Sequence, residues 1–271
     1  MVISSRDNPR IKRLSKLISS RKARSEEKEF VIEGLRGCVD AVRSDLIEHR
    51  LKMTAIYSVP EAFDAVRNSI GPDIFNRIPE DKLFEITRDV AEKVGDAETS
   101  QGIFVTAKCV DKSFSADILK KDGRYLVLDE LQDPGNLGTM LRTADAVGVD
   151  GVVLTGHCVD IYNPKTVRSA VGSLPRVDVF IDNDRKSVIE AFNDNGFKTA
   201  AAVVSEGEDI LGFDFSGGCA VVIGNEGRGL SDECRALCSH KVSIRMKGNI
   251  DSLNAATAAA ILLWEMTRGV Q

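Results

Sequence analysis

The second half of the chain alternates short apolar runs with amphipathic stretches. The apolar runs are mostly uninterrupted, which is typical of strands in a parallel sheet that is buried on both faces. They cover residues 125–128, 152–154, 177–181, 198–204 and 219–223. Helical stretches lie between or after them at 139–147, 166–171, 185–195 and 231–239, and an Ala-rich final helix is expected from Ser252 to about Arg268, capped by Asp251 or Ser252. This alternation predicts an α/β domain with a parallel sheet.

The first half of the chain predicts a smaller α/β module. Asn8 and Pro9 are suited to the N-cap and the first position of a helix, and Ile11, Leu14 and Leu17 follow at helical spacing. Strands are expected at 30–34, 54–59 and 102–106, a strand and a helix within 82–98, and helices through 38–46 and 61–68. The polar segment 110–123 suits a linker. We therefore predict a first domain over 1–108, a linker over 109–123 and a second domain over 124–271.

The composition is that of an ordinary globular protein, with 43% hydrophobic and 28% charged residues in 271. The apolar run at 255–264 is far shorter than the ~20 residues that a membrane span needs, and the N-terminus lacks the apolar core of a signal peptide. We expect a cytoplasmic protein that does not associate with membranes. Six scattered cysteines and three histidines lack the spacing of a zinc site, so we expect structural thiols and no metal.

Charge is distributed unevenly along the chain. The net charge of −5 argues against a nucleic-acid partner, but the distribution matters more than the total. Between residues 6 and 24 there is one acidic residue and a cluster of eight basic ones: Arg6, Arg10, Lys12, Arg13, Lys16, Arg21, Lys22 and Arg24. An amphipathic helix with solvated cations is the plainer interpretation of such a run. The density of this one favours binding to the phosphates of RNA.

Three polar segments follow apolar strands in the second half. They are Leu128 to Ala144 (LDELQDPGNLGTMLRTA), Ile223 to Ser231 (IGNEGRGLS) and Ser252 to Thr257 (SLNAAT). Ligands bind at the carboxyl ends of the strands in open α/β sheets, so we expect the three segments to form one composite site. We refer to them as the first, second and third motifs.

In the first motif, Pro134 and Gly135 form a tight turn into a helix whose N-terminal N–H groups suit an anion. Asn136 can donate and accept hydrogen bonds, and Arg142 can form a fork onto a phosphate or lie beside a hydroxyl. A tight loop with a surface arginine is the alternative. The glycines of the second motif, spaced G-x-x-G-x-G, let a ligand approach the backbone but do not form a dinucleotide fingerprint.

The third motif opens the final helix. Capping of that helix explains Ser252 without any functional role. Asn254 lies one turn further, directly before an apolar helix, and is harder to explain as a cap.

The three motifs together resemble those of the SpoU/TrmH family of RNA ribose 2′-O-methyltransferases, within the SPOUT superfamily. They occur in the family's order, and the segments 160–165 (DIYNPK) and 168–172 (RSAVG) also resemble family sequence. The similarity covers roughly Tyr125 to Arg268. More loosely, the segment from Ile3 to Gly34 resembles the appended RNA-binding domain of that family, which is similar to ribosomal protein L30.

The resemblance implies a fold, a cofactor and an assembly. The second domain would be a five- or six-stranded parallel sheet whose C-terminal segment threads a deep trefoil knot, an exception among folds. S-adenosylmethionine would be held largely by the backbone of loops at Gly224, Ile244 and Leu253, with Ala202 or Val203 nearby. Family members are homodimers whose sites lie near the subunit interface.

The resemblance also implies five polar site residues: Asn136, Arg142, Glu226, Ser252 and Asn254. A ribose 2′-hydroxyl is a weak acid, so its developing negative charge needs a proton acceptor or a nearby positive charge. A guanidinium scarcely deprotonates, so we interpret Arg142 as an electrostatic stabiliser, with a substrate phosphate as a candidate proton acceptor. Asn136 would orient the ribose or Arg142, Glu226 would fix Arg142 or a neighbouring loop, and the other two would shape the pocket.

The sequence thus favours a methyltransferase that uses S-adenosylmethionine on ribosomal (23S) RNA. Transfer RNA is the alternative substrate. A non-catalytic RNA-binding or resistance protein that retains the fold is an alternative from another class, and the missing G-x-G-x-x-G disfavours a nicotinamide-dependent enzyme. Glu130 departs from the family pattern, since a glycine is frequent there, but none of the five polar positions does.

Overall fold

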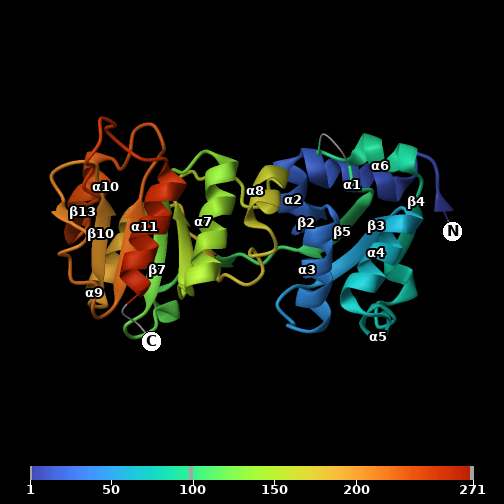
Figure 1. Cartoon of the computed structure of the whole chain (residues 1–271), viewed down its shortest axis with the longest axis horizontal. Coiled ribbons are helices and arrows are strands. Elements are labelled where there is room, and N and C mark those ends of the chain that lie inside the picture. Colours follow the sequence, from blue (N-terminus) through green and yellow to red (C-terminus); the bar gives the residue numbers. More distant parts are fainter. Residues whose placement is uncertain (1, 98–99, 269–271) are drawn as a thin grey trace. The chain divides into compact units, whose positions relative to one another are not determined.

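The computed structural model describes residues 2–97 and 100–268. The chain forms two compact units (Figure 1). The N-terminal unit contains the residues up to 110 together with 160–176, and the C-terminal unit contains 111–159 and 177–271. Among the described residues, no helix is long and apolar enough to cross a membrane.

The N-terminal unit is built on a five-stranded mixed sheet. Its strand order is β1 (Val2–Ile3), β4 (Leu83–Ile86), β3 (Met53–Ser58), β5 (Ile103–Lys108), β2 (Glu29–Glu33), and β5 runs antiparallel to both its neighbours. The helices are α1 (Pro9–Ser19), α2 (Arg21–Glu27), α3 (Leu35–Leu46), α4 (Pro60–Ile70), α5 (Pro72–Phe75), α6 (Arg88–Val94) and α8 (Pro164–Ala170), with a 3-10 turn, η1 (Glu80–Lys82). Asn8 caps α1 and Pro9 begins it, as the sequence predicted.

The C-terminal unit is built on an eight-stranded sheet in which every pairing is parallel. The order is β11 (Glu208–Asp209), β13 (His240–Ser243), β10 (Lys198–Ala202), β12 (Cys219–Ile223), β7 (Arg124–Asp129), β8 (Gly151–Thr155), β9 (Val179–Ile181), β6 (Lys112–Ser113). The helices are α7 (Pro134–Val147), α9 (Arg185–Asp194), α10 (Asp232–Leu237) and α11 (Ala255–Thr267), with a 3-10 turn, η2 (Ala116–Ile118). The predicted α/β class is confirmed; the knot stays a prediction.

The strand number exceeds the five or six expected, because two-residue strands extend both edges. One of them, β6, lies in the segment predicted to be a linker and pairs with β9. Strand β13 was not predicted from the sequence, because Val242 is its single apolar residue and no apolar run marks it. Six strands of three or more residues carry the core, which includes Tyr125, Phe192 and Phe197 in mutual edge-to-face contact.

Two helix starts in this unit differ from the expectation. Helix α7 begins at Pro134, because Asp133 caps it by accepting a hydrogen bond from the Asn136 N–H (2.7 Å). Helix α11 begins at Ala255, and its cap is Asn254, so capping by Asp251 or Ser252 was wrong. The Asn254 amide oxygen accepts from the N–H groups of Ala256 and Thr257 at 2.9 and 3.3 Å.

The segment 160–176 is separated in sequence from the unit in which it packs. Helix α8 contacts β2, and the Tyr162 ring lies 4.6 Å from the Phe30 ring. Asp160 forms an ion pair with Arg24 at 2.7 Å. The compact N-terminal unit therefore contains a piece of chain that a continuous second domain over 124–271 would include.

Candidate active site

Hydrogen bonds join the three motifs at one end of the C-terminal sheet. The Glu226 carboxylate of the second motif accepts from the N–H groups of Gln132 (3.1 Å) and Asp133 (2.8 Å) in the first. It also accepts from the Asn136 amide nitrogen at 3.2 Å. The Asn136 amide oxygen in turn accepts from the Asn254 amide nitrogen at 3.0 Å. One side chain from each motif thus takes part in a single chain of hydrogen bonds.

Glu226 is held in its ionised form by these contacts. Partial burial raises its pKa, but hydrogen bonds from the backbone of Asp133 and Gln132 and from the Asn136 side chain lower the pKa by more, so the net shift is downward. The carboxylate therefore acts as a charged clamp between the first and second motifs near neutral pH.

Asn254 has two functions in this arrangement. Its oxygen caps α11 and its nitrogen reaches Asn136. The expectation that capping explains Asn254 poorly is therefore wrong. Capping fixes the rotamer of the side chain, and this leaves the amide nitrogen to hold Asn136.

A cavity of about 560 Å³ opens beside this hydrogen-bonded chain. It lies at the carboxyl ends of β10, β12 and β13, where the predicted cofactor residues Ala202, Val203, Gly224 and Ile244 all line it. Leu253, Ser252 and Glu226 from the later motifs line the same cavity. Its volume is in the range of small-molecule sites. The structure therefore brings together all five predicted cofactor residues.

Gly224 allows the backbone to turn into this cavity. A β-carbon at this position would lie 2.4 Å from main-chain atoms of Gly229 and Leu230, which no side chain can tolerate. The loop closes on itself through a hydrogen bond from the Gly229 N–H to the Asn225 carbonyl at 2.8 Å. Glycine is thus required here because two backbone segments touch.

Arg142 does not reach the cavity within one chain. It lies on the exposed part of α7, six residues after Asn136, which on a helix is about 9 Å along the axis and on a different face. The described residues that line the cavity do not include it. Within the described part of the chain, its guanidinium forms no hydrogen bond or ion pair. Our expectation that Arg142 shares a crevice with the later motifs is therefore not met by a single chain.

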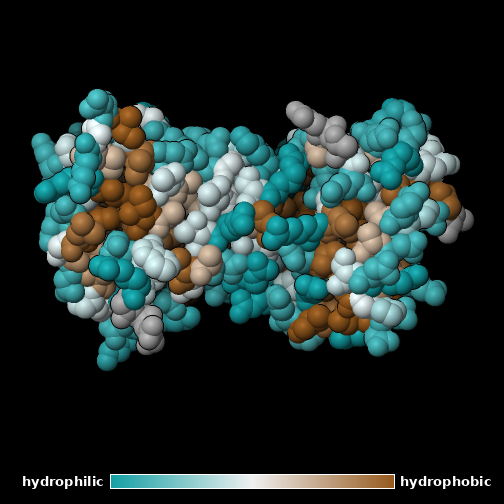
Figure 2. Space-filling view, viewed as in Figure 1, coloured by the Kyte–Doolittle hydropathy of each residue, from teal (hydrophilic) through white to brown (hydrophobic). Residues whose placement is uncertain are grey.

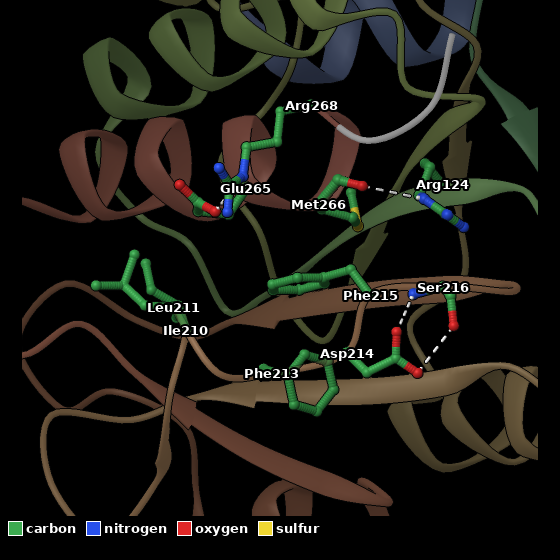
Figure 3. A pocket seen from close by; sticks show the side chains of 10 residues that line it. All are labelled: Arg124, Ile210, Leu211, Phe213, Asp214, Phe215, Ser216, Glu265, Met266 and Arg268. Atoms are coloured by element: carbon green, nitrogen blue, oxygen red, sulfur yellow. Dashed lines mark hydrogen bonds and ion pairs between the residues drawn. The ribbon is translucent and has the colours of Figure 1, made fainter.

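A second pocket, of about 410 Å³, lies near the amino end of β7 between α11 and residues 210–216 (Figure 3). Arg124 is buried there, but main-chain carbonyls occupy its guanidinium, including those of Met266 (3.2 Å) and Asp122 (2.9 Å). This arginine connects α11 to the sheet, so we assign the pocket no catalytic role.

The eight basic residues near the N-terminus differ in environment. Arg24 is only 4% exposed, donates to the carbonyls of Leu17 and Ile18 at 2.7 and 2.8 Å, and pairs with Asp160. Arg13 is half-buried between Glu27 and Glu29. The structure therefore places Arg24 in the core, where RNA cannot reach it, and gives Arg13 two carboxylate partners.

The other six basic residues are exposed. Arg6, Lys12 and Lys16 line a groove between α1 and α6 together with Lys93, which the sequence analysis did not select. Lys93 is distant in sequence and pairs with Asp89 on its own helix, so no run of charge marked it. Arg10 lies over the Phe84 ring at 4.3 Å, and Arg21 and Lys22 lie at the exposed start of α2.

A parallel sheet with a ligand-sized cavity and polar loops at its carboxyl edge is typical of α/β proteins that bind a small-molecule ligand. Comparison with known proteins makes this specific. The model of the SpoU rRNA methylase family matches residues 123–264, and that of the MRM3-like substrate-binding domain matches residues 8–105. The chain belongs to the SpoU rRNA methylase family, and the resemblance inferred from its motifs is confirmed.

Full-length relatives share both units. The chain is 31% identical over 98% of its length to an uncharacterized tRNA/rRNA methyltransferase of Synechocystis, of which it covers 93%. It is 31% identical over 97% of its length to the 23S rRNA (guanosine(2553)-2′-O)-methyltransferase of Bacillus subtilis, of which it covers 98%.

Solved structures agree with the fold. A crystal structure of an AdoMet-bound rRNA methyltransferase from Sinorhizobium meliloti matches 100% of this chain and 98% of its own, with a TM-score of 0.83 and 26% identity. The AviRb methyltransferase from Streptomyces viridochromogenes, in complex with AdoMet, matches 97% of this chain and 98% of its own, with a TM-score of 0.79 and 28% identity.

Proposed function

We propose that the protein transfers a methyl group from S-adenosylmethionine to a ribose 2′-hydroxyl of ribosomal RNA in the cytoplasm. The observation that carries the proposal is the hydrogen-bonded chain Glu226–Asn136–Asn254 beside the cavity, in a chain of the SpoU family. Relatives named as 23S rRNA 2′-O-methyltransferases support ribosomal RNA over transfer RNA.

The cavity fits S-adenosylmethionine in chemical character. Its wall combines aliphatic side chains such as Val203, Ile244 and Leu253, which suit an adenine ring, with the bare backbone at Gly224. Carboxylates of Glu206 and Asp251 at its edge suit a cationic sulfonium. When bound, the cofactor supplies an electrophilic methyl group, and no metal is needed for that chemistry. Ser252 would shape the pocket.

Arg142 is the proposed stabiliser of the negative charge that develops on the 2′-oxygen. Its exposed guanidinium has all its donors available, since none of them is used by another described residue. A substrate phosphate can accept the proton. Glu226 would hold Asn136 in place, and Asn136 would orient the ribose. The Glu226 clamp would in this way contribute to catalysis.

A homodimer would bring Arg142 to a cavity. Helix α11 packs against α7 and is mostly apolar, with Glu265 as its one charged residue, yet Trp264 is 61% exposed on it. Hydrophobic side chains gather over this helix on the molecular surface (Figure 2). A mostly apolar helix is normally covered, and a second copy with the same surface is the proposed cover. Arg142 of one subunit would then serve the cavity of its partner.

Mixing two inactive variants tests this arrangement. Arg142→Ala lacks the charge and Leu253→Asp lacks a working cavity. A mixed dimer has one site with an intact cavity and an intact arginine, so we expect about a quarter of the wild-type activity to return. No recovery after subunit exchange would show that both groups must come from one chain.

The basic groove between α1 and α6 is the proposed RNA-binding surface, formed by Arg6, Lys12, Lys16 and Lys93 with Arg10, Arg21 and Lys22 nearby. The decisive experiment uses S-adenosylmethionine with a labelled methyl group and ribosomal or transfer RNA, followed by nucleoside analysis. Label on ribose of ribosomal RNA supports the proposal. Label on a base, or none with an intact cofactor site, would contradict it and favour a base-methylating or a non-catalytic protein.

A further inference from the structure

A row of alternating charges runs from the interior of the C-terminal unit to the edge of the cavity. It consists of Asp129, Arg185, Glu130 and Arg228, and we refer to it as the charge row. Asp129 is 3% exposed at its side chain, Arg185 19%, Glu130 33% and Arg228 77%. The row therefore begins in the core and ends at a solvent-exposed guanidinium that lines the cavity.

Glu130 is the member that connects the first motif to the second. It lies in the left-handed region, with φ of 56°, and its carbonyl accepts from the Asn225 amide nitrogen at 3.1 Å. Its carboxylate receives Arg185 on one oxygen and Arg228 on the other, the latter at 3.3 Å. Arg185 is itself fixed by Asp129 (3.3 Å) and by the Ser231 hydroxyl (3.1 Å). Arg185 and its two partners thus fix the position of the Glu130 carboxylate.

The backbone of Arg228 is fixed, whereas its guanidinium is largely exposed to solvent. Its backbone N–H donates to the Asn225 side-chain oxygen at 3.2 Å, which fixes the loop. Among the described residues, its side chain makes one polar contact, from a guanidinium nitrogen to Glu130, so most of its five N–H donors face solvent. An arginine whose orientation is fixed but whose N–H donors are mostly unused is suited to bind a planar or tetrahedral oxyanion through two of those donors.

The chemistry of the proposed substrate supplies such an oxyanion. In RNA the 2′-hydroxyl and the 3′-phosphate are attached to neighbouring ribose carbons, so a 2′-oxygen at the cavity places a phosphate at its edge. We propose that Arg228 binds the RNA phosphate adjacent to the target ribose and that Glu130 is the positioning residue that aims it. This inference rests on the proposed function and adds to it a residue that orients the substrate.

The test compares four variants of the full chain: Arg228→Gln, Glu130→Gln, the double variant, and Lys186→Gln as control. Lys186 is an exposed cation of the same unit that pairs with Glu190 and does not line the cavity. Arg228→Gln should raise the KM for RNA about tenfold with kcat nearly unchanged. It should also reduce the slope of log affinity against log salt by about 0.7–0.9. The Kd for S-adenosylmethionine should stay at the wild-type value.

Glu130→Gln should raise the KM for RNA in the same direction by a smaller factor. The double variant should be no worse than Arg228→Gln, because a positioning residue has nothing to position once its partner is gone. Additive effects would overturn the role of Glu130. An unchanged KM and salt slope in Arg228→Gln, or a raised Kd for the cofactor, would overturn the role of Arg228. A wild-type protein that binds but does not methylate RNA would instead contradict the proposed function, since the salt slope still reports on Arg228.

Discussion

The two units use their polar residues in opposite ways. In the C-terminal unit, Asn136, Glu226 and Asn254 direct their hydrogen bonds at one another, across sequence separations of 90 and 118 residues. In the N-terminal unit, the partner of exposed Lys12 within the described ranges is Asp7, which is itself exposed. The first arrangement fixes geometry, as chemistry at one atom requires. The second leaves charge available to a long, flexible polyanion.

Each unit also contains an exception to its own pattern. Arg142 in the C-terminal unit has no partner among the described residues, although Asn136, Glu226 and Asn254 are joined by hydrogen bonds. Arg24 in the N-terminal unit is hydrogen-bonded and ion-paired, although the nearby basic residues Arg21 and Lys22 are exposed. The contrast predicts that Arg142 matters for rate and not for stability, and that Arg24 matters for stability and not for RNA.

Replacement of Arg142 should have the largest effect. Arg142→Ala should reduce the rate of methyl transfer by about 10²–10⁴, the usual loss when a stabiliser of developing charge is removed. Stability should change by no more than ~0.5 kcal/mol, because an exposed side chain without partners is removed. Single-turnover rates and thermal unfolding measure the two effects. Arg142→Ala with wild-type activity would place the stabilising charge elsewhere, whereas Lys186→Ala should change neither quantity.

The elements that were predicted well are those with a strong local signal. The strands β7, β8 and β12 are continuous apolar runs, and α1 has a cap, a proline and a helical stripe. The predicted site residues at the cavity gather because parallel strands end at one edge. No local signal showed the short edge strands, because two-residue strands exist only through their partners.

The roles of individual polar residues were predicted less well. Whether Arg24 meets solvent or Asp160 depends on a segment 136 residues away. Asn254 was recognised as a site residue, but its capping was misjudged, because its cap contacts and its contact with Asn136 use different atoms of one amide. Sequence patterns select residue types, whereas long-range packing decides which atoms remain free.

Arg24→Gln should give the next largest effect. Removing one member of a buried ion pair leaves Asp160 uncompensated and typically costs about 3–5 kcal/mol. Unfolding of the N-terminal unit, followed by hydrogen exchange in the full chain, should show this loss. The salt slope of RNA binding should be unchanged under conditions in which the unit is folded. Arg21→Gln, an exposed neighbour, serves as the matched variant, and equal loss of stability in both would contradict the distinction.

Removing charge from the basic groove should have the opposite result to Arg24→Gln, because it should weaken RNA binding without affecting stability. Lys12→Gln combined with Lys16→Gln removes two exposed cations, so the salt slope should fall by about 1.4–1.8 while unfolding is nearly unchanged. Arg36→Gln combined with Lys52→Gln removes the same charge from other exposed positions of this unit. If both pairs reduce the slope equally, RNA senses the net charge of the unit and not this groove.

The smallest effect concerns the charge of the Glu226 clamp and appears as a dependence on pH. Because folding lowers the pKa of Glu226 below its usual 4.5, the ionised carboxylate contributes stability above that pH and loses it as the pH falls through the folded-state value. Glu226→Gln keeps the shape and removes the charge. It should cost ~1 kcal/mol at pH 7, less than the about 1.5–3 kcal/mol typical of charged hydrogen bonds, because Glu226 is exposed and solvent screens its charge. In thermal scans of the C-terminal unit, the midpoints of the two proteins should differ by about 3 °C at neutral pH and converge as the pH falls below the folded-state pKa of Glu226. The matched variant is Glu190→Gln, whose carboxylate pairs only with exposed Lys186. A Glu226→Gln difference that persists unchanged into acid would mean that the shape of the side chain, and not its charge, holds the first and second motifs together.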